Sequence, residues 1–420
     1  MTGGVLFAWR LAYGVLGPGK RAVAWGLRPL AGELASTVAA TMSRRRRPLA
    51  RSIVLLAVAV AFAISTAVFN STYEAQAEVD AKLTNGADVA VTESPGTVVP
   101  AAQAQRIGAV AGVRSVEPVQ HRFAYVGADL QDLYGVRPAT IAGVTALQDS
   151  YFSGGTAREL MDTLAKAPDS ILVSAETVKD FQLHPGDQIT LRLPDSRTGQ
   201  QAAVSFHYAG IVSEFPTAPK DSFFVANADY VAQRTGSDAV GAFLVDSGGQ
   251  DTAGVAQRVR DLVGPTAAIT DISTTRAKVG SSLTAVGLSG LTHVELSFAL
   301  VLAAGAGGLV LALALNERRR SFAVARALGA RRRHVLAFIG GEVSVVAVGG
   351  AVAGVALGWV LAEMLASVLT GVFDPPPVAL SVPWVYLTGM AVVIVAALAV
   401  ASGLITRLAG RDAVSAFREI

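Results

Sequence analysis

The chain has 420 residues, of which 52% are hydrophobic and only 16% are charged, and it contains no Cys. A soluble domain usually carries about a quarter charged residues, so this composition argues against an ordinary soluble enzyme. Without cysteines there is no disulfide framework, thiolate metal site or cysteine nucleophile. The five histidines are scattered and form no pair at helical spacing for a metal site. We therefore predict no catalytic residue, no metal site and no cofactor in this chain.

Residues 1–51 are expected to form a cytoplasmic or interfacial segment. Residues 5–16 are apolar but contain Arg10 and are too short to span a membrane, and residues 33–42 fit an amphipathic surface helix. Gly14 to Lys20 match the start of a P-loop, but Arg21 replaces the Ser or Thr that should hold Mg²⁺, and no strand precedes. A Gly/Pro turn is the favoured interpretation. The basic run 44–47 stands directly before an apolar segment, which favours a topology anchor that meets anionic lipid head groups over a nucleic-acid site.

Four segments are long and apolar enough to cross a bilayer, which takes about 20 residues. They are residues 52–69, 294–315, 335–369 and 384–405, and in the third we expect residues 343–365 to lie in the membrane. The sequence thus predicts a polytopic α-helical membrane protein with four transmembrane helices and a mixed α+β extracytoplasmic domain between the first and second.

That domain, residues 70–293, shows strands and helices alternating at spacings suited to βαβ units. We expect strands at 87–92, 122–126, 170–174, 189–193, 204–212 and 242–245, and helices at 101–111, 175–182 and 251–263. His184-Pro185-Gly186-Asp187 predicts a turn, since Pro presets φ and Gly supplies a positive φ. Residues 273–292 are polar, lack Pro and are expected to form a helical stalk.

Charge predicts the orientation, because Lys and Arg mark cytoplasmic loops. Residues 1–51 hold nine of them, the 316–334 loop holds seven, and the tail 406–420 holds three, whereas the 370–383 loop holds none. Residues 70–293 carry 24 acidic against 16 basic residues. Both termini are therefore expected in the cytoplasm and residues 70–293 outside.

Two further patterns concern helix contacts. Gly350, Gly354 and Gly358 recur at helical spacing in the third span, which favours close approach of another helix. In the 316–334 loop an apolar stripe is expected on a short basic helix, and Gly329 is a plausible stop; the stripe consists of Phe322, Ala325, Ala327 and Leu328. Such a helix suits docking of a partner, and a topological charge cluster is the alternative.

Glu317-Arg318-Arg319-Arg320 and Arg326-Ala327-Leu328-Gly329-Ala330, followed by the Gly-rich span, resemble the signature of the FtsX-like permease family of ABC transporters. The layout of one span, a large outer domain and three spans is similar to that of its MacB-type members. The stretch 174–212 is similar to the family's periplasmic core domain, and Arg411 to Arg418 to its C-terminal tail. The family usually has Glu-Ile where this chain has Ser321-Phe322. Residues 1–43 match no part of the family pattern, which would be expected if this chain corresponds to one half of a longer, duplicated permease.

The resemblance implies a non-catalytic permease subunit in a bacterial cell membrane, whose loop 316–334 is the coupling helix. Its partners would be a separate ATPase subunit holding ATP and Mg²⁺, a second permease half (identical or paralogous), membrane lipids and an extracytoplasmic protein, but no nucleic acid. ATP hydrolysis would move the ectodomain and export or extract an apolar, lipid-linked or peptide substrate. The alternative is a non-transporting signalling or scaffold protein that activates an outer partner such as a cell-wall hydrolase. The docking residues would be Phe322, Ala325, Arg326, Leu328 and Gly329.

Overall fold

The computed structural model describes residues 2–94, 97–218, 222–281, 332–369 and 379–415, together with 294, 297–299, 301, 302 and 305. These residues form two compact units. We call Met1–Glu74, Leu288–Val372 and Ala379–Ile420 the helical unit, and Ala75–Gly287 with Phe373–Val378 the mixed unit. The expected second span and the 316–334 loop lie almost entirely outside the described residues.

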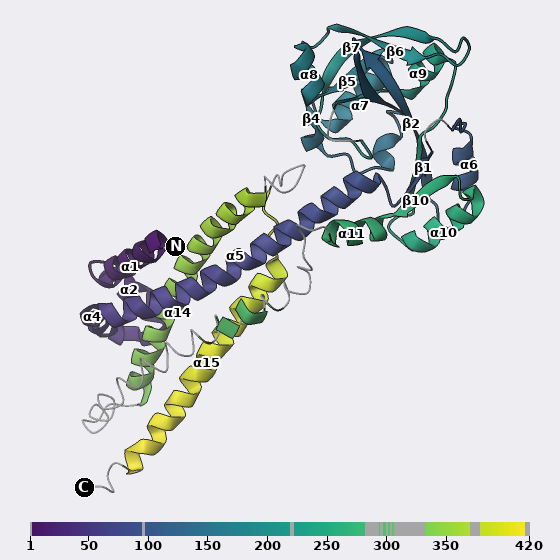
Figure 1. The fold of residues 1–420 in the computed structure, drawn as a ribbon. Helices are drawn as coiled ribbons and strands as arrows, with labels where there is room; N and C mark the ends of the chain where they lie inside the picture. The colour runs from purple at the N-terminus through teal and green to yellow at the C-terminus, as the bar shows by residue number, and fades with distance from the viewer. Residues whose placement is uncertain are drawn as a thin grey trace. The chain divides into compact units, whose positions relative to one another are not determined.

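The helical unit begins with a group of short helices (Figure 1). They are α1 (Thr2–Leu16), α2 (Lys20–Gly26), α3 (Arg28–Ala31), the 3₁₀ turn η1 (Gly32–Leu34) and α4 (Ala35–Arg44). The P-loop-like stretch is the turn between α1 and α2, as the Gly/Pro interpretation expects, and Arg28–Ala31 starts with Pro29 in its first turn, where a missing N–H does no harm. The surface helix expected at 33–42 corresponds to η1 and α4.

Three long helices complete this unit: α5 (Arg46–Asn85), α14 (Arg332–Leu369) and α15 (Trp384–Ser415). Among the described residues, Arg46–Asn85 and Ala337–Val368 contain stretches long and apolar enough to cross a membrane, and Leu6–Leu16 and Trp384–Ala397 are shorter apolar helices. Residues 46–74 of α5 belong to the helical unit and residues 75–85 to the mixed unit. The helix expected at 52–69 therefore continues to Asn85, because no Pro or Gly interrupts it before Gly86, which has φ +79°.

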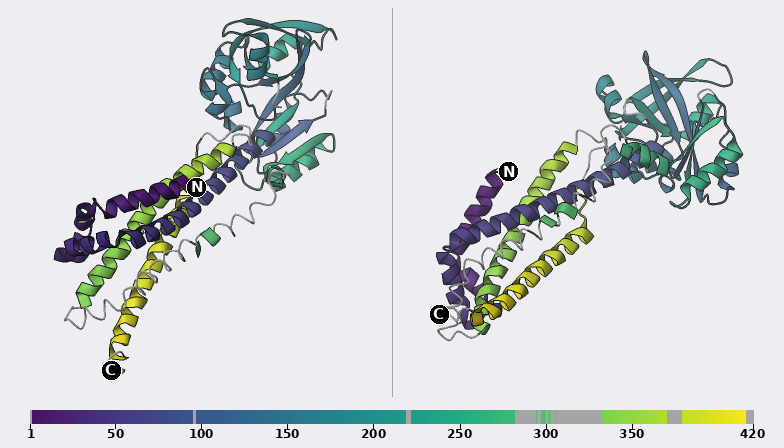
Figure 2. Two further views of the ribbon diagram at one scale, coloured as in Figure 1. Left: turned by 60° about the vertical axis from the view of Figure 1, so that its left-hand side comes forward. Right: turned by 60° about the horizontal axis from the view of Figure 1, so that its bottom comes forward.

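The mixed unit combines a ten-stranded sheet with surrounding helices (Figures 1 and 2). Its strands are β1 (Val89–Glu93), β2 (Ser115–Val126), β3 (Asp129–Val136), β4 (Phe152–Ser153), β5 (Ser170–Ser174), β6 (Gln188–Pro194), β7 (Gln201–Val212), β8 (Phe223–Asn227), β9 (Ala242–Asp246) and β10 (Ala267–Asp271). Its helices are α6 (Gln103–Gly108), α7 (Ala157–Lys166), α8 (Ala175–Phe181), α9 (Ala228–Thr235), α10 (Thr252–Val263) and α11 (Ile272–Ser281), with short 3₁₀ turns η2 (Ile141–Gly143) and η3 (Asp149–Tyr151).

One part of the sheet is built from two interlocked βαβ units. The spatial order is β10-β1-β9-β2, and β1 is antiparallel to both β10 and β9, while β2 is antiparallel to β9. The segments β1-α6-β2 and β9-α10-β10 are thus each a βαβ unit with one foreign strand between its two strands, the split βαβ arrangement. Val89, Val91, Phe243 and Val245 pack with residues of α6 and α10 in one buried cluster, so both helices cover the same face.

The rest of the sheet lies between β2 and β9 in the chain. β3 pairs in parallel with β8, β5 pairs in parallel with β7, and β6 pairs with β7 antiparallel. Strand β2 belongs to both parts, because residues 115–119 pair with β9 and residues 120–126 pair with β3.

The predicted strands and helices of the mixed unit are found, with shifted ends, and the turn at 184–187 has Gly186 at φ +93°. The strand expected at 122–126 is only the second half of β2. Six strands and α-helices were not predicted: β3, β4, α7, β8, α9 and β10. In β3 the acidic residues Asp129 and Asp132 interrupt the apolar alternation. Of the stalk expected at 273–292, α11 covers the beginning, and residues 282–292 lie outside the described part of the chain.

Candidate functional site

The three glycines predicted for helix packing all lie against α5. A β-carbon added to Gly350 would lie 2.7 Å from Cδ2 of Leu56, one added to Gly354 would lie 2.6 Å from Cβ of Val60, and one added to Gly358 would lie 2.9 Å from Cβ of Ile64. We call these six residues of α14 and α5 the glycine seam.

The seam follows from sequence spacing on both helices. Residues four apart lie on one face of an α-helix, so the three glycines line up on α14 and their three partners line up on α5. Val60 is only 3% exposed, and the other two partners are similarly buried. Where lipid surrounds a helix, hydrophobic burial gives no driving force, and close packing of backbones stabilises the contact instead.

A second set of contacts lies in the mixed unit, where α5 ends and α11 begins. Asn85, the last residue of α5, is 2% exposed. Its Nδ2 donates to the carbonyl oxygen of Ala87 at 2.7 Å, and its Oδ1 accepts from the hydroxyls of Thr270 at 2.8 Å and Thr275 at 3.0 Å. One amide side chain thus joins the end of α5 to β10 and to α11.

Two aspartates complete the connections. Asp271 ends β10 and caps α11: Oδ1 accepts from the backbone N–H groups of Ser273 and Thr274 and from the Ser273 hydroxyl, and Oδ2 accepts from the Thr274 hydroxyl. Asp88 accepts from the backbone N–H and hydroxyl of Ser247 and from the N–H of Gly249 through Oδ2. Burial raises the pKa of both carboxyls, but these hydrogen bonds outweigh it and lower each pKa below its ordinary value.

An ion pair joins the two helices directly. Nε of Arg276 lies 2.6 Å from Oε2 of Glu78, and Nη2 lies 2.7 Å from Oε1, a two-point contact that fits the planar guanidinium. The hydrogen bond from Arg276 lowers the pKa of Glu78, and Lys82 adds to the effect at 3.4 Å. We call Glu78, Asn85, Asp88, Asp271, Thr275 and Arg276 the base junction.

The base junction was not found from sequence. Its one readable signal is Asp271 followed by Ser273 and Thr274, which is typical of a helix start. The remaining partners come from positions almost 200 residues apart, such as Glu78 and Arg276, and no local spacing brings them together.

A buried carboxyl lies elsewhere in the mixed unit. Glu117 on β2 is 2% exposed, and its Oε1 has no hydrogen-bond partner. Burial raises its pKa, and hydrogen bonds with Thr140 and Arg137, together with the charge of Arg137, offset the rise only in part. Among the described residues, no group of three or more His, Asp or Glu side chains is placed to hold a metal ion.

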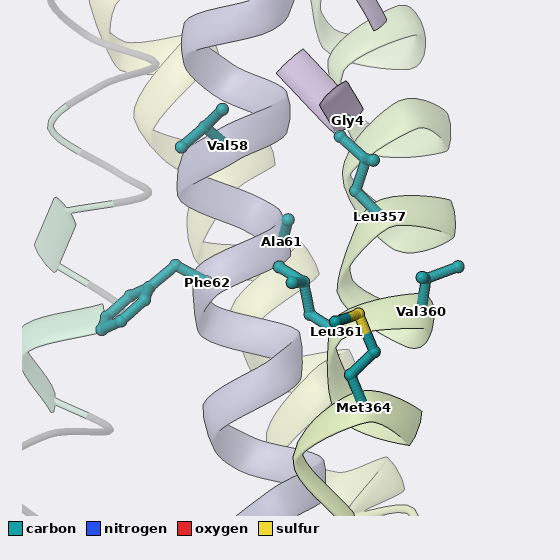
Figure 3. Close-up of a pocket in the computed structure, with 8 residues that line it drawn as sticks. All are labelled: Gly4, Val58, Ala61, Phe62, Leu357, Val360, Leu361 and Met364. Atoms are coloured by element: carbon teal, nitrogen blue, oxygen red, sulfur yellow. The ribbon is translucent and has the colours of Figure 1, made fainter. Parts of the chain in front are cut away.

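Figure 3 shows a small apolar pocket in the helical unit. Its volume is about 160 Å³, and no polar side chain lines it. Its walls come from α1, α5 and α14: Gly4, Val58, Ala61, Phe62, Leu357, Val360, Leu361 and Met364. The predicted docking residues Phe322, Ala325, Arg326, Leu328 and Gly329 lie outside the described residues.

The apolar helices and the inserted α/β sheet unit are features of a membrane protein that carries a folded domain. Residues 294–412 match the family model described as FtsX-like permease C-terminal. This match confirms, over residues 294–412, the resemblance to FtsX-like permeases drawn from the loop motif.

Solved structures similar to the chain include the periplasmic region of MacB from Actinobacillus actinomycetemcomitans, at 14% identity, covering 47% of this chain and 95% of that one with a TM-score of 0.31. The extracellular domain of the noncanonic ABC-type transporter YknZ from Gram-positive bacteria is similar at 12% identity, covering 44% of this chain and 99% of that one with a TM-score of 0.29. A comparison with curated proteins gives no match.

Proposed function

We propose that this chain is a non-catalytic permease subunit that couples ATP hydrolysis in a separate ATPase chain to movement of the mixed unit. The observation that carries the proposal is the FtsX-like permease match over residues 294–412. ATP and Mg²⁺ belong to the ATPase chain. A second permease half, identical or paralogous, would complete the transporter.

In this proposal residues 52–69, 294–315, 335–369 and 384–405 form four transmembrane spans, with both termini in the cytoplasm and the mixed unit outside. Large apolar side chains exposed on α14 and α15 support it, among them Val352 at 62% and Val385 at 88%, since soluble proteins rarely leave such faces in contact with water. The loop charges give the orientation.

Transmission depends on the two contact sets. The glycine seam fixes α14 to α5, so the two helices shift together. Since α5 is one helix from Arg46 to Asn85, a displacement along it reaches Asn85, where the base junction passes it to β10 and α11. A nucleotide drives such a change only if the two conformations bind it with different affinity.

The substrate class proposed is an apolar, lipid-linked or peptide molecule that is exported or extracted. Four spans leave little room for a wide polar pore. The pocket in Figure 3 has only apolar walls, which agrees with an apolar path.

Docking is tested by copurification with a candidate ABC ATPase chain. Arg326→Glu combined with Leu328→Asp should abolish copurification and ATPase stimulation, because it reverses a charge and places a carboxylate on the apolar side of the loop. Arg318→Lys in the same loop is the control and should leave both unchanged. Retained assembly with the double variant contradicts the docking proposal.

Transmission is tested at the base junction. Arg276→Glu places two carboxylates against each other, and it should lower transport while leaving ATPase binding intact. Adding Glu78→Arg restores an opposite pair and should restore part of the transport. If Arg276→Glu transports normally, the base junction does not transmit the movement.

A further inference from the structure

Helix α1 has an apolar outer face and a small-residue inner face. Ala8, Ala12 and Leu16 recur every four residues and are buried, Ala8 at 2% exposure. The opposite side presents large apolar side chains, with Phe7 at 65% exposure, together with Leu6, Leu11 and Val15. Nothing described in the helical unit covers that outer side.

The inner face runs along α5 in the opposite direction. The guanidinium carbon of Arg46, at the start of α5, lies 4.2 Å from the ring centre of Tyr13. Further along, Ala8 packs in one cluster with Ala57 of α5 and Ala353 of α14. In Figures 1 and 2 helix α1 runs alongside α5 and α14, with its N-terminal end away from the start of α5.

The start of α1 is in close contact with α5 and α14. Gly4 lines the same pocket as Ala61 of α5 and Leu357 of α14 (Figure 3). A β-carbon added to Gly4 would lie 2.9 Å from Cδ2 of Leu357, so the absence of a side chain permits this approach. The pocket therefore joins α1 to both long helices.

The depth of α1 follows from this alignment. Ala61 stands nine residues into the 52–69 span, and at 1.5 Å per residue that is roughly 14 Å, close to the middle of a hydrocarbon layer of about 30 Å. Gly4 lies at the same level. Tyr13 stands nine residues from Gly4, roughly 14 Å nearer the cytoplasmic side, where its ring meets the Arg46 guanidinium.

We infer that α1 lies inside the hydrocarbon layer against α5 and α14, and that its outer face contacts lipid acyl chains. The inference rests on the proposed function, which places α5 and α14 across the membrane. The outer face of α1 is continuous with exposed apolar residues of both helices, Phe62 and Val360, at the pocket. For residues 2–16 this replaces both the expected cytoplasmic or interfacial position and the cytoplasmic N-terminus of the proposed topology.

Arg10 is compatible with this depth. It is exposed and stands one turn from Tyr13, so its long side chain reaches the level of Arg46 and the head groups while its methylene groups remain among apolar atoms. The basic residues of α2 and α3 follow after the turn at 17–19, on the cytoplasmic side.

The chain contains no cysteine, so single-cysteine variants report one position each. We would measure the labelling rate with a membrane-impermeant maleimide in inside-out vesicles holding the full chain. Phe7→Cys and Leu6→Cys are the test variants, Val355→Cys on α14 is the membrane control, and Lys20→Cys is the water-exposed control. Labelling in denaturing detergent confirms that each cysteine is present.

Phe7→Cys and Leu6→Cys should react at the rate of Val355→Cys, on the order of tenfold or more below Lys20→Cys, because the thiolate is disfavoured and the reagent is excluded in hydrocarbon. If both react as fast as Lys20→Cys while Val355→Cys stays slow, the inference is overturned. If Val355→Cys is also fast, the transmembrane placement of α14 fails, and with it the proposed function.

Discussion

Helix α5 is held by two different kinds of contact along its length. In the helical unit it meets glycines of α14 through the glycine seam, with no hydrogen bond or charge in the contact. In the mixed unit its last residues meet α11 through the base junction, where an amide, three carboxylates and a guanidinium are paired. The difference shows two ways of stabilising a helix contact. Close packing of backbones stabilises helices where lipid surrounds them. Paired charged and polar groups instead add hydrogen bonds of defined geometry.

The largest effect is expected in the glycine seam. Gly354→Ala should destabilise the helical unit by up to about 3 kcal/mol, because the new β-carbon overlaps Val60 and overpacked contacts cost about that much. The matched control is Gly349→Ala, where the β-carbon would lie 3.4 Å or more from Ile53 and the gain in helix propensity is the same. Thermal unfolding in detergent compares the two, and equal melting temperatures would contradict the seam.

A smaller effect is expected at the base junction. Asn85→Ala removes the acceptor shared by Thr270 and Thr275 and should lower the unfolding free energy of the mixed unit by about 2 kcal/mol, since buried partners are left unsatisfied. Thr270→Val removes one of these bonds and should cost less. Hydrogen exchange of the α11 amides measures both, and unchanged protection in Asn85→Ala would count against the junction.

The pH dependence of stability should distinguish Glu117 from the three carboxyls of the base junction. The pKa of Glu117 is raised on folding, so the folded state holds its proton more firmly, and the stability contributed by protonation is lost as pH rises through the folded pKa. Glu117→Gln should therefore stabilise the mixed unit at neutral pH and change little in acid. The opposite sign holds for Glu78, Asp88 and Asp271, whose lowered pKa values add stability that is lost as pH falls through them. Melting temperatures measured from about pH 2 to about pH 8 check both signs.

The smallest effect is expected for the ion pair itself. The Arg276 and Glu78 side chains are 47% and 34% exposed, so water and salt screen them, and Arg276→Lys should change the unfolding free energy by less than about 1 kcal/mol. The difference from the unchanged chain should shrink further in high salt. A salt-independent loss of several kcal/mol would mean that Arg276 acts through packing and not through charge.

Much of the fold could be predicted from periodic patterns. The apolar stretches gave α5 and α14, and β5 was placed at Ser170–Ser174 with the bounds now observed. Strand β8 was missed because its five residues are all buried and show no alternation of apolar and polar side chains. Helix α7 was missed although Thr156 and Glu159 form a capping box. For the site, the glycine spacing was readable, since one helix carries it. The base junction could not be predicted from the sequence, because its partners meet only after the sheet has formed. The docking residues stay a prediction.

Strand β2 has a mechanical consequence. Its first half hydrogen-bonds to β9 and its second half to β3, so the two parts of the sheet share a single extended backbone, and neither can turn without bending that backbone or breaking its hydrogen bonds. The two parts of the sheet in the mixed unit are therefore joined stiffly through β2.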